Sequence, residues 1–126
     1  METKILEIFT KEEEINKIIE PIKHLSFDDF KKHPHLEFSF MEKLTDHNLI
    51  ESTFNKFSLI RSIELRENNK GQKSYSLNYE LEDGTFVMIS LSCDMSIIIN
   101  AFHAKTNYKR FEKSLRKNYS DKFKQL

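Results

Sequence analysis

The chain has 126 residues, of which 20 are Lys or Arg and 20 are Asp or Glu, so its formal net charge is zero. It contains two Gly, two Pro and one Cys, which excludes collagen-like chains, low-complexity linkers, disulfide-stapled scaffolds and thiolate zinc fingers. Its 11 Phe and many Ile and Leu suffice for one hydrophobic core. We therefore predict a single domain over residues 1–126, with a mainly helical part over 1–57, a sheet over 58–103 and a helix over 106–120.

The N-terminal segment 1–9 is acidic and amphipathic, and it lacks the basic region and apolar stretch of a signal peptide. No segment contains the roughly 18 consecutive apolar residues that a membrane span needs. These features predict a cytoplasmic protein that makes no membrane contact. Cys93 is expected to be a small side chain that is buried or at a loop edge rather than a nucleophile, because no helix start or evident base flanks it.

Helical patterns follow the N-terminal segment. Thr10 and Glu13 have the spacing of a capping box and precede isoleucines at helical spacing in residues 15–19. Ser26 and Asp29 have the same spacing and predict a second, short helical turn.

The next segment is ambiguous. The His-Pro-His stretch at 33–35 is expected to end the preceding turn. Residues 36–44 alternate as in a strand but also contain an apolar stripe at helical spacing, so both structures stay open. Thr45 or Asp46 then caps a predicted helix. Its apolar stripe consists of Leu49, Ile50, Phe54 and Phe57.

From residue 58 the apolar period changes to two, which is typical of strands. Four such segments follow one another, separated by turns at 68–71, 83–84 and 93–95. They predict a four-stranded antiparallel meander. Together with the flanking helices, they predict an α+β fold with N-terminal helices and a basic C-terminal helix.

The Asp-Gly turn at 83–84 tests the strand register, because directly opposed residues share a face of the sheet. A two-residue loop places apolar residues opposite polar ones, whereas a three-residue loop over 82–84, with Gly84 left-handed, buries one face. The predicted pairs are Tyr79 with Val87, Leu77 with Ile89 and Tyr75 with Leu91. The same parity across 93–95 predicts the pairs Leu91 with Ile97, Ile89 with Ile99 and Val87 with Ala101.

The predicted sheet has two different faces. The apolar face carries Leu59, Ile63, Leu65, Tyr75, Leu77, Tyr79, Leu81, Val87, Ile89, Leu91, Ile97 and Ile99. The other face carries Ser62, Glu64, Arg66, Ser74, Ser76, Asn78, Glu80, Ser90, Ser92 and Asn100, with Phe86 and Met88. We expect helices to cover the apolar face. The polar face is either solvent-exposed, as in many antiparallel sheets, or the lining of a ligand-facing concavity.

Basic charge concentrates after the sheet. Residues 102–126 have eight Lys or Arg and two acidic residues, a net charge of +6, whereas residues 1–66 and 67–101 each have a net charge of −3. Thr106 or Asn107 caps the predicted final helix, whose cations are either a solvated face or a contact for a polyanion such as RNA. Candidate nucleic-acid contacts are Lys109, Arg110, Lys113, Arg116 and Lys117.

Four side chains are candidates for acid–base chemistry or phosphate binding. His103 ends the most apolar strand beside Lys105, a pairing suited to proton transfer next to a phosphate; the alternative is a partly buried structural histidine. His47 begins a helix, where the helix dipole favours a neutral base; the alternative is a surface histidine. Arg61 falls on the apolar parity, so it needs a helix carboxylate or a bound phosphate as partner.

The sequence contains no motif that supports metal or cofactor binding. His33 and His35 lack a matching carboxylate cluster, so we interpret them as loop residues rather than metal ligands. No glycine-rich phosphate loop, Ser-centred elbow or dinucleotide fingerprint is present in the sequence. We therefore expect no metal and no cofactor.

A helical start, a meander that begins after His47 and the closing Ile-Ile-Ile-Asn-Ala-Phe-His stretch at 97–103 resemble the layout of the small bacterial ribonuclease toxins, the barnase, EndoU, colicin D and RelE-like group. The resemblance covers roughly His47 to Tyr119. It implies metal-independent RNA cleavage on the open sheet face. One departure is charge, because such toxins are usually basic and this chain is neutral. The residues to which it assigns catalytic roles are His47, Arg61, Asn100, His103 and Lys105.

The implied reaction uses general acid–base catalysis, in which one histidine takes the ribose 2′-OH proton and the other protonates the leaving oxygen. Whether the chain is an enzyme stays open, because an interaction protein without catalysis also fits. An immunity protein, antitoxin or phage-encoded inhibitor would meet a basic protein partner through its acidic N-terminal helices. The acidic residues of that surface are Glu12, Glu13, Glu14, Glu20, Asp28 and Asp29.

Overall fold

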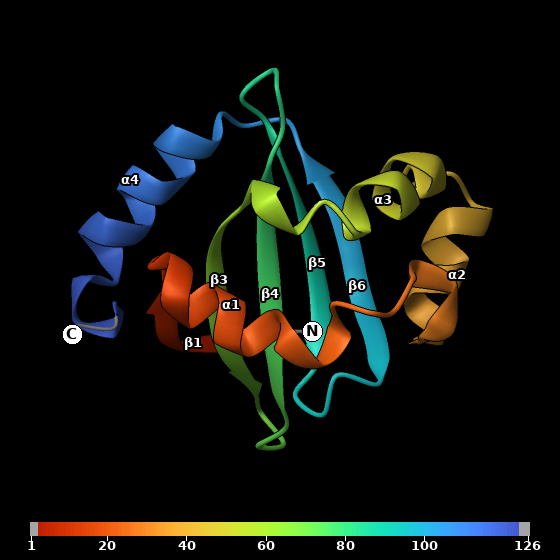
Figure 1. The fold of residues 1–126 in the computed structure, drawn as a ribbon, viewed down its shortest axis with the longest axis horizontal. Helices are drawn as coiled ribbons and strands as arrows, with labels where there is room; N and C mark the ends of the chain where they lie inside the picture. Colours follow the sequence, from red (N-terminus) through yellow and green to blue (C-terminus); the bar gives the residue numbers. More distant parts are fainter. Residues whose placement is uncertain (1–2, 124–126) are drawn as a thin grey trace.

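The computed structural model describes residues 3–123 and shows an α+β fold around a six-stranded sheet with the strand order β1-β3-β4-β5-β6-β2 (Figure 1). The helices are α1 (Glu12–Ile19), α2 (Pro34–Met41), α3 (His47–Phe54) and α4 (Tyr108–Asn118). The strands are β1 (Thr3–Phe9), β2 (Lys31–Lys32), β3 (Ile60–Asn68), β4 (Lys73–Glu80), β5 (Phe86–Ser92) and β6 (Ile97–Ala104). The α+β class is confirmed, but the sheet is larger than the four predicted strands.

Strands β3 to β6 run antiparallel to one another in chain order, as predicted for the meander. Within the β4–β5 hairpin the predicted register is confirmed. The opposed pairs are Tyr79 with Val87, Leu77 with Ile89 and Tyr75 with Leu91. Gly84 has φ +88°, the left-handed conformation that the three-residue loop requires. Local turn chemistry and apolar alternation together therefore determine this hairpin.

The predicted register between β5 and β6 is wrong. The observed pairs are Val87 with His103, Ile89 with Ala101 and Leu91 with Ile98. The pairing shifts between Ser90 and Leu91. As a result Ile98 is fully buried, while Ile97 and Ile99 are only partly buried. Because this stretch has isoleucine at three successive positions, apolar parity alone could not choose which of them faces the core.

Two strands come from the segment that was predicted to be mainly helical. Strand β1 pairs antiparallel with β3, and a register shift between Ile5 and Glu7 interrupts its period-two pattern. Strand β2 has two residues and pairs parallel with β6, which makes the sheet mixed. Neither strand carries the sustained alternation on which the sequence prediction relied.

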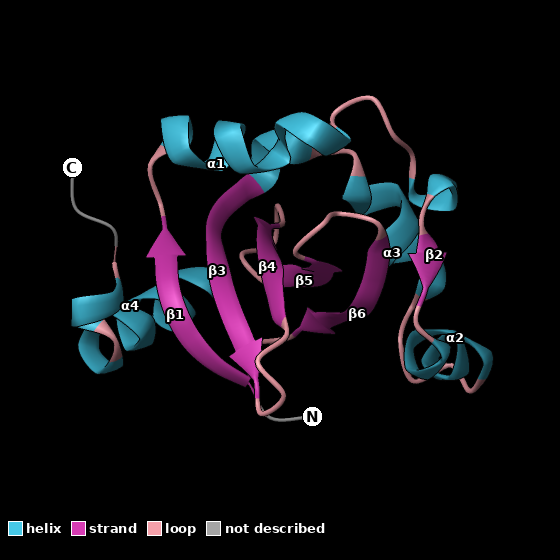
Figure 2. Cartoon of the chain, turned by 90° about the horizontal axis from the view of Figure 1, so that it is seen from below, coloured by secondary structure: helices cyan, strands magenta, loops and turns pink. Residues whose placement is uncertain are grey.

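Helices α1 and α3 cover one side of the sheet, and α4 lies on the other (Figure 2). The core on the covered side includes Ile19, Ile22, Ile50, Phe54, Leu77 and Ile89, all almost fully buried. The hydroxyl of buried Tyr79 donates to the Phe54 carbonyl at 2.8 Å, which ties the end of α3 to the centre of the sheet. Burial raises the pKa of this hydroxyl above its ordinary value.

Residues 36–41, which fitted a strand or a helix, belong to helix α2. Pro34 occupies its first turn, where a missing N–H costs little. The ring of His33 accepts a hydrogen bond from the His35 amide at 3.1 Å and caps the helix. Leu36 is fully buried and attaches α2 to the core.

The caps explain where the other helices begin. The Ser26 amide donates to the Asp29 carboxylate at 2.7 Å, within the predicted capping box. Asp46 accepts a hydrogen bond from the Leu49 amide at 3.1 Å at the start of α3, also as predicted. The cap predicted for the first helix is wrong, because Lys11 rather than Thr10 precedes α1 and makes no side-chain cap bond.

Helix α4 is shorter than the predicted 106–120 helix and covers the opposite face of the sheet (Figure 2). Asn107 caps it by accepting a hydrogen bond from the Arg110 amide at 3.3 Å. Leu115 packs with Ile5 and Ile8 of β1 in a second, smaller apolar cluster. The strand that the sequence analysis missed therefore provides the surface on which α4 rests.

Candidate functional site

Two of the predicted catalytic residues lie together where β6 ends. The Lys105 amine is 3.1 Å from His103 Nδ1, and His103 Nε2 is 2.8 Å from the Thr85 hydroxyl. That hydroxyl donates to the Asp83 carboxylate at 2.6 Å. The hydrogen bonds from Thr85, with smaller contributions from the charges of His103 and Lys105, hold the pKa of Asp83 below its ordinary value. The four side chains form one hydrogen-bonded chain around the β4–β5 turn.

The directions of these bonds follow from the donors available. A charged Lys105 has donors only, so His103 Nδ1 accepts and Nε2 carries the proton that is donated to Thr85. The Thr85 proton goes to Asp83. In this arrangement both ring nitrogens of His103 have partners, and the chain braces a turn. His103 can act as a general acid or base only when a ligand displaces one of these partners.

His47 lies elsewhere, at the first residue of α3. Its ring stacks on Phe40 with centroids 4.3 Å apart and contacts Phe27 at 5.8 Å. Its Nε2 is 3.9 Å from a carboxylate oxygen of Glu51, one helical turn further on. These contacts hold the ring against α2 and the segment before β2.

Arg61 and Asn100 also have partners of their own. Arg61 sits at a register shift in β3, which turns it out of the core, and it pairs at 3.0 Å with Glu80 of the neighbouring strand rather than with a helix carboxylate. The side-chain oxygen of Asn100 accepts a hydrogen bond from the Ala101 amide at 2.9 Å. Among residues 3–123, only His103 and Lys105 of the predicted catalytic group contact each other. The catalytic roles of all five stay predictions.

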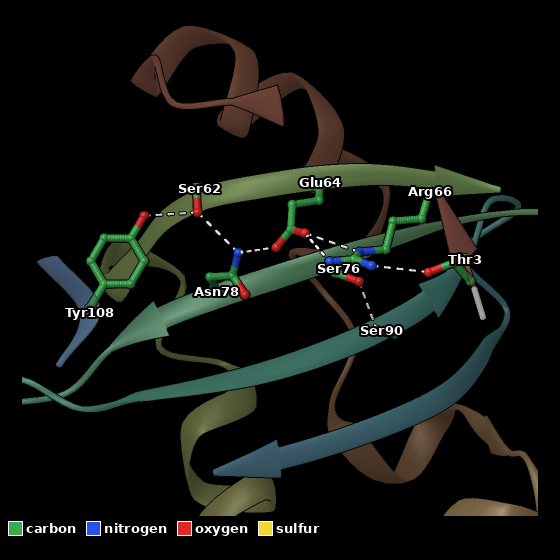
Figure 3. A network of polar contacts seen from close by, with 8 residues as sticks. All are labelled: Thr3, Ser62, Glu64, Arg66, Ser76, Asn78, Ser90 and Tyr108. Atoms are coloured by element: carbon green, nitrogen blue, oxygen red, sulfur yellow. Dashed lines mark hydrogen bonds and ion pairs between the residues drawn. The ribbon is translucent and has the colours of Figure 1, made fainter. Parts of the chain in front are cut away.

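The polar face of the sheet is not an exposed surface at its centre. Ser62, Glu64, Ser76 and Asn78 are at most 1% exposed. Ser62, Glu64 and Asn78 form a network with Arg66, and the Ser76 hydroxyl is 2.9 Å from the Ser90 hydroxyl (Figure 3). The Glu64 carboxylate accepts two hydrogen bonds from the Arg66 guanidinium and one from the Asn78 amide at 2.7 Å. Arg66 also donates to the Thr3 hydroxyl at 3.0 Å. The buried Glu64 carboxylate and the partly buried Arg66 guanidinium therefore link β1, β3 and β4.

A second branch of the network reaches α4. The Asn78 amide donates to the Ser62 hydroxyl at 3.0 Å, and the Tyr108 hydroxyl is 2.8 Å from Ser62 (Figure 3). The Tyr108 hydroxyl is also 3.1 Å from Glu112. Burial raises the pKa of the Tyr108 hydroxyl above its ordinary value, so this group stays a neutral donor. Glu112 then accepts from Arg116 at 3.3 Å. Helix α4 is thus attached to the sheet by polar as well as apolar contacts.

The sequence contains one signal for this network, the spacing of its two charged residues. Glu64 and Arg66 are two residues apart on one strand, so they share a face of the sheet. Asn78 falls opposite Ser62 once the β3–β4 register is known. The register needed the tertiary structure, because the β3–β4 turn at 68–71 did not determine it.

Comparison with protein-family models, with curated proteins and with solved structures finds no match to this chain. No helix within residues 3–123 is both long and apolar enough to cross a membrane. Over the same residues, no group of three His, Cys, Asp or Glu side chains is arranged to hold a metal ion.

The outer face of α2 is the most exposed apolar surface of the described chain. Phe38 and Met41 are 52% and 77% exposed, and Leu44 just after the helix is 73% exposed. Pro34, Phe38 and Met41 follow one another at i, i+4 and i+7, so they share one side of the helix. Leu36 and Ser39 on the other side are buried. We call Phe38, Met41 and Leu44 the α2 patch.

The predicted acidic surface is only partly formed. Glu14 is buried in α1 and does not contribute to it. The exposed carboxylates of that set are Glu12, Glu13, Glu20, Asp28 and Asp29. Glu20 is paired with Lys23 at 3.1 Å, and Asp29 serves the Ser26 cap.

Proposed function

We propose that the protein is a non-catalytic interaction protein that binds a partner protein through the α2 patch. The observation that carries the proposal is the exposure of Phe38, Met41 and Leu44, three large apolar side chains of one short segment. A helix with apolar residues on two opposite sides normally has both of those sides buried. One side of α2 is buried by this chain, so the other is expected to be buried by a partner.

The position of the patch supports this function. Leu36 and Phe40 fix α2 against the core, so the outward side chains are presented on a folded helix rather than on a loose loop. Contiguous exposed apolar surface with a polar rim is typical of protein interaction sites. Three charged residues beside the patch are exposed, the acidic Glu37 and Glu42 and the basic Lys43.

The chemistry of the patch specifies the partner. It should offer an apolar groove for the side chains of Phe38 and Met41, because a helix with apolar anchors along one side docks in this way. Basic residues should surround that groove and face Glu37 and Glu42. The exposed carboxylates of α1 and of the segment before β2 would then steer the approach of a basic partner more than they would set its affinity.

Site-specific photocrosslinking of the full chain in its native cell tests the proposal. A photoreactive amino acid at position 38 should crosslink to one dominant protein, and the same group at position 25 should not, although Leu25 is also exposed. With the purified partner, Phe38→Ser and Met41→Gln should each weaken binding by about 30-fold, as expected for buried apolar anchors. Leu25→Ala, which removes an exposed apolar residue elsewhere, should leave affinity unchanged.

Three results would overturn the proposal. They are the absence of any crosslink at position 38, a crosslink to a second copy of this chain, and a complex that tolerates Phe38→Ser together with Met41→Gln. Circular dichroism of each variant establishes that the fold is retained, which is expected because both side chains are mainly in solvent.

Metal-independent ribonuclease activity is the second candidate. The contact of 3.1 Å between His103 and Lys105 favours it, since it places a proton-transfer group beside a cation that could face a phosphate. Purified protein incubated with total RNA in EDTA should then cleave it, and His103→Ala should lower the rate by about 100-fold or more. His24→Ala, at an exposed histidine, is the matched control. Absence of cleavage, or cleavage unchanged in His103→Ala, excludes this activity.

A further inference from the structure

The outer side of α4 is a continuous cationic surface. At about 100° per residue, its five cations fall within one arc of about 120°. In order around the helix they are Arg116, Lys109, Lys113, Lys117 and Arg110. All five are exposed, and the buried residues Tyr108 and Leu115 lie outside the arc. The pattern is that of one face and not of scattered surface charge.

No carboxylate neutralises most of this face. Within residues 3–123, Arg116 is the only one of the five cations that forms an ion pair, with Glu112. Glu112 lies toward the buried side of the helix, because the Tyr108 hydroxyl is 3.1 Å from its carboxylate. Lys109, Arg110, Lys113 and Lys117 therefore form no ion pair in this part of the chain, although Lys109 lines a pocket with Glu80 and Glu82. We call these four residues the α4 basic face.

The helix that carries this face is held firmly in place. Asn107 caps its first turn, and the Tyr108 amide donates to the Gly84 carbonyl at 2.6 Å. Leu115 packs on Ile5 and Ile8 of β1. The fixed helix keeps the spacing between its cations constant, so the row suits a ligand with regularly repeated negative charge.

We propose that the α4 basic face binds the phosphate backbone of single-stranded RNA. Lys109, Lys113 and Lys117 recur at every fourth residue, about 6 Å apart along the helix axis, and each can contact one phosphate in succession. Lysine gains affinity for such a chain by releasing its counterions. This binding is separate from the α2 patch, and neither proposal depends on the other.

Two other anionic partners fit this face less well. A protein interface is depleted in lysine and needs apolar or aromatic anchors at its centre, and none lies within the cationic arc. Attachment to an anionic membrane requires an apolar side that enters the lipid. The apolar residue Leu115 of α4 is already buried against β1.

The end of α4 adds a reason to favour unpaired nucleotides. Tyr119 follows the helix directly and is 39% exposed, although its amide is fixed by a hydrogen bond to the Leu115 carbonyl at 2.8 Å. An exposed aromatic ring two residues after the last of these cations offers a stacking platform for a base that is free of a duplex. Single-stranded RNA supplies both the phosphates and such bases.

Fluorescence anisotropy with a labelled single-stranded RNA, measured with the full-length protein at several salt concentrations, tests the proposal. With four phosphate contacts, affinity should fall by about 50-fold between about 50 mM and about 200 mM salt. The triple substitution Lys109→Gln, Lys113→Gln, Lys117→Gln should remove most of this dependence, leaving a slope near that of about one contact. The matched control is Lys56→Gln, Lys70→Gln, Lys73→Gln, which removes the same charge from exposed positions elsewhere and should change the slope little.

A second measurement separates base stacking from charge. Tyr119→Ala should weaken RNA binding by about fivefold or more, whereas Tyr119→Phe, which keeps the ring, should restore it. The proposal is overturned if the wild-type protein does not bind the RNA, or if the two triple variants lose affinity equally. It is also overturned if single-stranded DNA binds more tightly, or if polyglutamate displaces the RNA at equal charge.

Discussion

The side-chain nitrogen of Asn78 lies 2.7 Å from a carboxylate oxygen of Glu64, and both side chains are completely buried. This contact determines the orientation of the amide, because a carboxylate requires a donor and only the nitrogen can supply one. The amide oxygen then has no hydrogen-bond donor within reach. It is the one buried side-chain polar atom without a partner in residues 3–123. Burial of the ion pair thus leaves an acceptor unsatisfied beside it.

Glu64→Gln is expected to destabilise the protein by about 2 kcal/mol, because it removes the counter-charge of the Arg66 guanidinium, which is only 24% exposed. Urea unfolding followed by circular dichroism measures the change. The control is Glu67→Gln on the same strand, whose partner Lys4 is 71% exposed at 3.5 Å. That substitution should cost no more than about 1 kcal/mol. Equal losses in the two variants would show that the buried pair contributes nothing beyond surface charge.

Tyr79→Phe should lower stability by about 1 kcal/mol near neutral pH, because the Phe54 carbonyl loses its donor. Burial raises the pKa of Tyr79, so its contribution is complete below about pH 10, the ordinary pKa of the unfolded chain, and is lost as pH rises toward the folded value. The wild-type protein should therefore lose stability above about pH 10, and Tyr79→Phe should lose less. Unfolding curves between neutral and alkaline pH measure both effects. An unchanged alkaline slope in Tyr79→Phe would contradict this assignment.

Gly84→Ala should destabilise the protein more than Gly71→Ala does. Both glycines have positive φ, +88° and +79°, so both substitutions incur about 1–2 kcal/mol of backbone strain. At Gly84 the added Cβ would also lie 2.9 Å from Asn107 Nδ2, whereas at Gly71 it meets nothing within 4 Å. The Asn107 side chain can move aside only by disturbing the cap of α4, which adds about 1 kcal/mol. Thermal melts of the two variants test the difference, and equal melting temperatures would refute it.

The two sides of α2 should respond oppositely to substitution. Leu36→Ala creates a cavity in the core and should cost about 2–5 kcal/mol. Phe38→Ser on the exposed side should change the stability of the free protein by about 0.5 kcal/mol or less. It should also reduce the fluorescence of a dye that binds exposed apolar surface. A large loss of stability in Phe38→Ser would mean that the residue is needed for folding rather than for a partner.

The sequence predicted the contacts of the candidate residues only where both partners are close together along the chain. His103 and Lys105 are two residues apart, so their contact follows from the strand itself. The position predicted for Arg61 on the apolar face is wrong, because one register shift in β3 turns this residue outward to Glu80. The α2 patch was not predicted, since nothing in the period of residues 36–44 shows which side of the helix another element covers.

Turn chemistry and alternation along the chain determined the β4–β5 hairpin, the caps at Ser26, Asp46 and Asn107, and the α+β class, because each depends on residues close in sequence. Tertiary structure alone decided that β1 joins the sheet, that Ile98 rather than Ile97 enters the core, and that Glu64 and Asn78 are buried. These outcomes depend on pairing between distant segments, where several registers satisfy the same local pattern and only the packing of the whole chain distinguishes them.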